Sequence, residues 1–180
     1  MVVDDDTLFG EVVRVDGVNA YLARSVSRSS RELGVGEFVG VECGGDVVVS
    51  VVTGVERSIP EDVVSMISLE MESKYLPYSS ELESSYYRLF GLGLLSRSGV
   101  QHGLRVAPRL RSRVWRLDDD AIRKFHLSHG RANISYFNRY REALGDDLLL
   151  AIVDELWALL PEAHRMLAPV RKYLKGGGAL

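Results

Sequence analysis

The sequence predicts an α+β protein: a small N-terminal β-barrel followed by a C-terminal helical region. Two observations predict this class. Between residues 8 and 57, β-branched residues recur in short runs with glycines between them, which is typical of successive short strands. From Asp118 onward, acidic residues or proline, which favour the start of a helix, alternate with glycines, which favour its end. We therefore expect a barrel domain over residues 1–117, with an inserted helix at about 60–76, and a helical region over residues 118–180.

The barrel half begins with four candidate strands, at residues 9–15, 18–23, 38–43 and 47–55. Asp16-Gly17 and Gly44-Gly45 favour tight hairpin turns, because glycine accepts positive φ. The run from Val47 to Val55 is apolar at nearly every position, as expected for a strand buried on both faces. The strand pattern predicts a core that includes Val12, Phe38, Val39, Val41, Val49 and Val51.

The next segments are expected to alternate between helix and strand. Pro60-Glu61-Asp62 favours a helix start, since proline suits the first turn and acids suit the positive end of the helix dipole. A strand is expected at 85–95, a loop at 96–103 and a partly exposed extended segment at 107–113, flanked by 104–106 and 114–117. Four helices should follow, at 118–127, 132–144, 148–160 and 161–175.

The helix at 148–160 carries a wide apolar stripe. An apolar stripe of this width favours burial against a neighbouring element over solvent exposure. We expect the stripe to be covered, either by the barrel or by a second copy of the chain. Self-association is therefore one of the expected partner types.

Composition excludes several classes of function. No run approaches the roughly 20 apolar residues of a membrane helix, and the acids at positions 4–6 do not suit a signal peptide, so we expect a cytoplasmic protein without a membrane. Cys43 is the sole cysteine, which excludes an intrachain disulfide and a cysteine zinc site. Lysine is rare beside arginine, which hints at a hot-living source.

No catalytic constellation is present in the sequence. His126 and His129 have the spacing of a metal clip but better suit a helix C-terminus, and Asp118-Asp119-Asp120 better suits a helix N-cap. We expect no catalytic residues, no cofactor and no metal, and therefore no enzymatic activity. An enzyme of unrecognised type stays as a third hypothesis.

The charge distribution marks the candidate site. Residues 97–141 carry 11 bases and 3 acids, and 97–116 contains six arginines and no acid. Alternation at 109, 111 and 113 would place three guanidinium groups on one face of a strand, where they can bind phosphates or carboxylates in bidentate fashion. The candidate binding residues are Arg105, Arg109, Arg111, Arg113, Arg116 and Trp115.

These arginines have two alternative roles. They can pair with the acidic residues of 1–96, or they can bind a partner. We expect internal pairing for Arg105 and Arg116, and exposure for Arg109, Arg111 and Arg113. If the partner is nucleic acid, Trp115 and His102 would supply stacking groups.

Three stretches carry a family resemblance: Gly10-Glu11-Val12-Val13-Arg14-Val15, then Leu33 to Val41, then Val51 to Glu56. Together they resemble the HAS-barrel, the N-terminal domain of HerA-type DNA-translocating ATPases. Tyr86 to Gly93 and Arg105 to Trp115 follow in the order that this family shows. The resemblance covers roughly residues 8–120 and consists of the spacing of hydrophobic residues and glycines.

The phosphate-binding motif GxxxxGK[ST] of those ATPases is absent from this sequence. The resemblance therefore implies a HAS-barrel without the ATPase domain. It implies docking onto a protein of a DNA-processing assembly, such as the NurA nuclease or the ATPase. Direct nucleic-acid binding through the arginine-rich segment 97–116 is the alternative.

Overall fold

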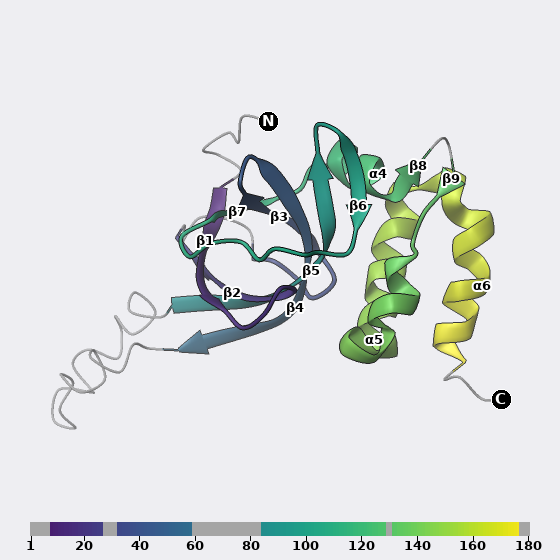
Figure 1. Cartoon of the computed structure of the whole chain (residues 1–180). Coiled ribbons are helices and arrows are strands. Elements are labelled where there is room, and N and C mark those ends of the chain that lie inside the picture. Colours follow the sequence, from purple (N-terminus) through teal and green to yellow (C-terminus); the bar gives the residue numbers. More distant parts are fainter. Residues whose placement is uncertain (1–7, 27–31, 59–83, 129–130, 177–180) are drawn as a thin grey trace, which may run out of the picture.

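The computed structural model describes residues 8–26, 32–58, 84–128 and 131–176. Within these residues, seven strands form one antiparallel sheet, six of which close into a barrel through the pairing of β2 with β5. The seventh strand, β6, extends the sheet beside β5 (Figure 1). The strands are β1 (Leu8–Val15), β2 (Ala20–Ser25), β3 (Phe38–Cys43), β4 (Asp46–Ser58), β5 (Ser84–Ser96), β6 (Gly99–His102) and β7 (Arg113–Arg116).

Strand β4 is buried on both faces, as its composition predicts. Val48 and Val52 point into the barrel interior, whereas Val47, Val49 and Val51 lie in the second core, between the barrel and the helices. The turn before β4 uses Gly44 and Gly45 at positive φ, which confirms the expected hairpin. Every expected core residue is at most 2% exposed: Val12, Phe38, Val39, Val41, Val49 and Val51.

The helices stand together against one side of the barrel (Figure 1). Asp118 caps the first of them, as expected, and accepts a hydrogen bond of 2.7 Å from the amide of Ala121. The long helix α5 changes direction at Gly145, whose φ of 75° and ψ of 160° are not helical. The elements are α4 (Asp119–His126), β8 (Leu127–Ser128), β9 (Arg131–Ala132), α5 (Tyr136–Leu159), the 3-10 turn η3 (Pro161–Ala163) and α6 (His164–Lys175).

The apolar stripe of α5 is covered within the chain. Leu149, Ile152 and Leu156 are at most 1% exposed and belong to the same core as Val49 of β4 and Leu167 of α6. The barrel and α6 therefore cover this face, and the prediction that it is covered is confirmed.

The structure differs from the sequence prediction in three places. The segment 96–103, expected to be a loop, contains β6 and pairs with β5. The helix expected from Ala132 begins at Tyr136, because β8 and β9 form a small hairpin before it. Residues 109–112, expected to be extended, form a turn. The helix predicted at about 60–76 lies outside the described residues.

Candidate docking surface

The candidate site lies on the segment 103–112, which connects β6 to β7 and is called the arginine loop below. In Figure 1 it runs across the front of the barrel, from β6 to β7. Backbone hydrogen bonds hold both of its ends: Gly103 donates to Leu92 of β5, and Arg111 donates to Val12 of β1. Between these ends, Leu104 and Ala107 pack against the barrel-interior core. The loop is therefore held in a fixed position against the barrel.

A tight turn at 109–112 replaces the strand that the arginine alternation predicts. The amide of Ser112 donates to the carbonyl of Arg109, and Arg111 has φ = 65°. It is the single non-glycine residue with positive φ in the described part of the chain. A residue with a Cβ pays roughly 1–2 kcal/mol for this conformation. Arg111 is thus held in a strained position in which glycine would fit better.

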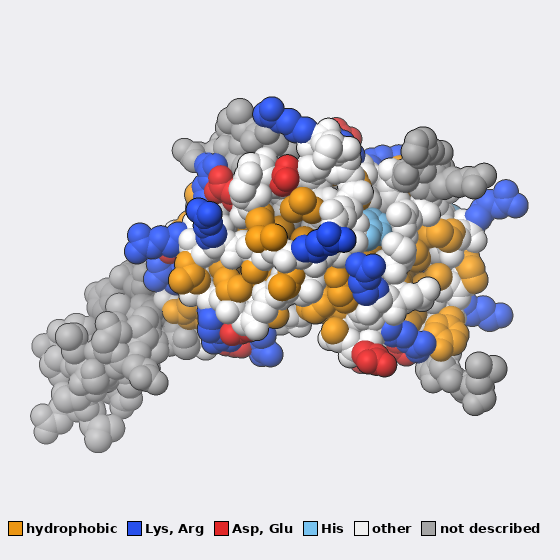
Figure 2. Space-filling model, in the orientation of Figure 1, with side chains coloured by type: hydrophobic (Ala, Val, Ile, Leu, Met, Phe, Trp, Pro, Cys, Tyr) orange, Lys and Arg blue, Asp and Glu red, His pale blue; other side chains and the backbone are white. Residues whose placement is uncertain are grey.

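The arginine loop presents basic and apolar side chains together to solvent. Arg105, Arg109 and Arg111 are exposed, and their side chains have no hydrogen bond or ion pair with any residue that the structure describes. Val106 is 68% exposed and Leu110 62%, the largest values among the large apolar residues that the structure describes. Basic and apolar side chains lie next to each other over the barrel in Figure 2. These five residues are called the arginine surface below.

The other predicted site residues are placed differently. Arg113 pairs with Glu42 at 3.1 Å, and its hydrogen bonds lower the pKa of that carboxyl group. Arg116 pairs with Glu37 at 3.3 Å. The expected internal pairing is therefore confirmed for Arg116. For Arg105, no pairing is present among the described residues.

Trp115 belongs to the core between the barrel and the helices. It is 5% exposed, and a Cβ on Gly40 of β3 would come within 2.7 Å of its indole ring. Its ring has no open face on which a base could stack. His102, the other expected stacking group, is half-buried and lies within hydrogen-bond distance of the Ser135 hydroxyl and the Phe125 carbonyl. Neither residue belongs to the arginine surface.

The buried histidine at the barrel–helix contact has a structural explanation. His126 is fully buried, and its Nδ1 donates to the carbonyl of Ile122 at 2.8 Å, because a carbonyl can only accept. Its Nε2 then accepts from the hydroxyl of Tyr136 at 2.8 Å. Burial lowers the pKa of His126 to about 3, so the ring is neutral. His129, its suggested companion ligand, lies outside the described residues.

A pocket of about 370 Å³ opens beside the arginine loop. It lies where the β3–β4 turn, β6 and the start of the loop meet, and two of its lining residues, Arg105 and Val106, also belong to the arginine surface. Sequence reasoning missed this pocket and the two exposed apolar residues of the loop. The order Arg-Val-Ala-Pro-Arg-Leu-Arg mixes bases with apolar residues, but the strand interpretation rested on the alternating arginines alone.

The comparisons with known proteins add no family assignment: no family model matches the chain, and no curated protein matches it. Among the described residues, no group of three or more histidine, cysteine or acidic side chains could hold a metal ion. Nor does any described helix combine the length and apolarity that a membrane crossing requires.

Proposed function

We propose that this chain is a non-catalytic docking module, a HAS-barrel-like domain whose arginine surface binds an acidic segment of a protein in a DNA-processing assembly. One observation carries the proposal: among the described residues, three arginines without partners share a loop with the two most exposed large apolar side chains. Protein interfaces combine apolar contact area with arginine, whose planar fork binds carboxylates in bidentate fashion.

The observed barrel supports the family part of the proposal. A closed six-stranded antiparallel barrel in the described residues is compatible with the HAS-barrel resemblance. In that family, the barrel serves as a contact platform for a partner nuclease. We assign the corresponding contact role in this chain to the arginine loop.

A protein partner fits the arginine surface better than nucleic acid does. Sequence-independent binding of single strands combines basic groups with exposed aromatic rings. The arginine surface exposes valine and leucine, while Trp115 is buried and His102 is half-buried and hydrogen-bonded. Exposed aliphatic side chains next to cations suit a peptide that has both apolar and acidic residues.

The test is a pull-down from nuclease-treated native extract with the wild-type chain and the Arg109→Glu/Arg111→Glu variant. We expect a protein that the wild type retains and the variant loses. Each reversal removes one attraction and adds one repulsion, worth about 1–3 kcal/mol for the pair, so affinity should fall on the order of tenfold to hundredfold. The melting temperature should not fall, because neither side chain has a described partner to lose and the reversal relieves repulsion among the arginines.

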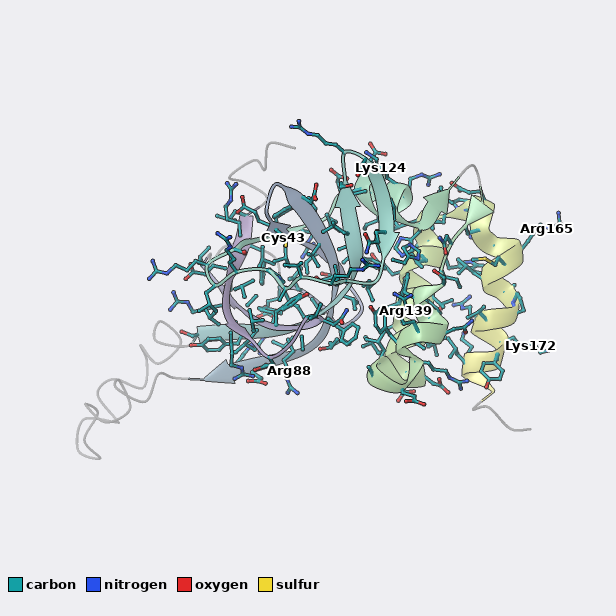
Figure 3. All side chains as sticks on the ribbon, viewed as in Figure 1. Cys43, Arg88, Lys124, Arg139, Arg165 and Lys172 are labelled. Carbon is teal, nitrogen blue, oxygen red and sulfur yellow. The ribbon has the colours of Figure 1, made fainter. Side chains whose placement is uncertain are left out.

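A matched control reverses the same charge elsewhere. Arg165 and Lys172 lie on the exposed side of α6, on the helical half of the molecule (Figure 3). The Arg165→Glu/Lys172→Glu variant should retain the same protein. Equal loss of binding in both variants would show that net charge, and not the arginine surface, drives capture. Capture that requires intact nucleic acid would favour the alternative of direct nucleic-acid binding.

A further inference from the structure

The pocket beside the arginine loop is the end of the barrel interior. Its lining residues come from the β3–β4 turn, from β5 and β6, and from the loop. Three of them, Cys43, Leu94 and Leu104, pack against the barrel-interior core and form its apolar floor. The full lining is Cys43, Gly44, Asp46, Leu94, Gln101, Gly103, Leu104, Arg105 and Val106. It is called the mouth pocket below.

The floor of the mouth pocket is fixed by close packing. Gly91 of β5 lacks a side chain where Leu104 reaches inward, since a Cβ there would come within 2.5 Å of the Leu104 Cδ1 atom. The sulfur of Cys43 lies 4.0 Å from the carbonyl oxygen of Ala107. These contacts join the loop to the strands, so the mouth pocket is a preformed feature of the fold.

The mouth pocket and the arginine surface adjoin each other and share residues. Arg105 and Val106 belong to both. Burial and the Asp46 carboxylate raise the pKa of the Cys43 thiol, and the positive charge of Arg109 opposes them, which places Arg109 within electrostatic reach of the pocket. Asp46 is the one carboxylate among the residues that line it.

We infer that the mouth pocket receives a bulky apolar side chain of the acidic partner segment whose carboxylates bind Arg105, Arg109 and Arg111. This inference rests on the proposed function and deepens it by naming the motif: an aliphatic or aromatic residue flanked by aspartate or glutamate. Interfaces gain most of their affinity where an apolar anchor fills a desolvated pocket, and surrounding charges add specificity. The arginines alone would recognise any acidic segment, whereas the mouth pocket would recognise the apolar side chain that the partner segment carries.

The probes are fluorescent acidic nonapeptides that are identical except for a central leucine or glycine. Burying a leucine side chain is worth about 1.5–3 kcal/mol, so the leucine peptide should bind on the order of tenfold to hundredfold more tightly in anisotropy titrations. Both peptides should lose affinity in the Arg109→Glu/Arg111→Glu variant.

The single cysteine supplies a direct readout of pocket occupancy. Cys43 lines the mouth pocket and lies on the barrel in Figure 3, and the 180-residue chain has no other thiol. Its modification by a small thiol reagent at mildly alkaline pH should slow several-fold when the leucine peptide saturates the protein. Saturation with the glycine peptide should leave the rate unchanged.

A filling substitution completes the test. Gln101 lines the mouth pocket opposite Leu94, whereas its neighbour Val100 points to the other face of β6 and does not line it. Gln101→Trp should abolish the preference for leucine over glycine, and Val100→Trp should retain it. Unchanged Cys43 reactivity under saturating leucine peptide would overturn the pocket inference and leave the docking proposal standing. Absence of binding by either peptide, or binding that survives the arginine reversals, would overturn both.

Discussion

His126 should make this protein sensitive to mild acid. The ring is fully buried where α4 meets the barrel and α5. It lies edge-on to the Phe38 ring, with 5.1 Å between the ring centroids, and its Nε2 is 2.8 Å from the Tyr136 hydroxyl. Its Nε2 accepts a hydrogen bond, so protonation would replace that acceptor with a second donor facing a hydroxyl. Neutral imidazole is therefore part of the contact between barrel and helices.

The size of the effect follows from the two pKa values. Burial lowers the folded-state pKa to about 3, against an ordinary value of 6.5. Because the pKa of His126 is lower in the folded protein, the unfolded chain binds the proton at a higher pH than the folded protein does. The free energy of unfolding therefore falls as the pH drops below 6.5, and it stops falling near pH 3. Between pH 7 and pH 5 this linkage removes about 2 kcal/mol from the free energy of unfolding. Burial also lowers the pKa of His102, which acts in the same direction.

Urea unfolding at pH 7 and pH 5 measures this loss, with His126→Gln as the comparison. A glutamine amide can still donate to the Ile122 carbonyl and accept from Tyr136, but it does not titrate. We expect the stability difference between the two pH values to be about 2 kcal/mol smaller in the variant. In the wild type, the His126 ring signals in NMR spectra should not shift over this range. An equal pH dependence in both proteins, or ring signals that titrate near 6.5, would refute the reasoning.

Three further substitutions test the packing and the turn. Leu156→Ala empties a fully buried position and should lower the free energy of unfolding by about 2–5 kcal/mol in urea titrations; a loss below about 1 kcal/mol would contradict its core role. Gly10→Ala would place a Cβ on the carbonyl oxygen of Arg24, so cooperative unfolding should be lost; a normally folded variant would contradict the close approach of β1 and β2. Arg111→Gly should be more stable than Arg111→Ala by roughly 0.5–1 kcal/mol, because only glycine relieves the positive φ; equal melting temperatures would count against the strained turn.

The local signals in the sequence predicted the fold well. Asp118 is a helix cap because its carboxylate can satisfy an orphan amide, and Gly145 interrupts a helix because it accepts φ = 75°. The continuous apolar run from Val47 predicts a strand buried on both faces, because both faces of such a strand need apolar neighbours. The β8–β9 hairpin was missed, since two-residue strands carry no periodicity.

The candidate site was harder to predict because it depends on tertiary contacts. Alternating arginines suggested a strand, and nothing in the local sequence marks Arg111 for the left-handed region that glycine prefers. Arg113 and Arg116 find their acids in Glu42 and Glu37, about 70–80 residues away in the chain, on the neighbouring strand and just before it. Trp115 is buried in the core between the barrel and the helices. The local sequence of β7 does not indicate which elements cover it.

The arginine loop combines costs that folding alone does not explain. Arg111 pays for positive φ, Leu110 and Val106 stay in water, and three cations lie close together without partners among the described residues. The repulsion among the arginines and the exposure of the aliphatic side chains both become smaller when an acidic, apolar segment covers the loop, because carboxylates offset the positive charges and the aliphatic side chains leave water. Strain held in a well-fixed loop points to function when the surrounding structure enforces it, and here hydrogen bonds to β1 and β5 hold both ends. Binding should therefore weaken as ionic strength rises, while the apolar contribution of the mouth pocket persists, so the leucine preference should outlast the charge-driven affinity at high salt.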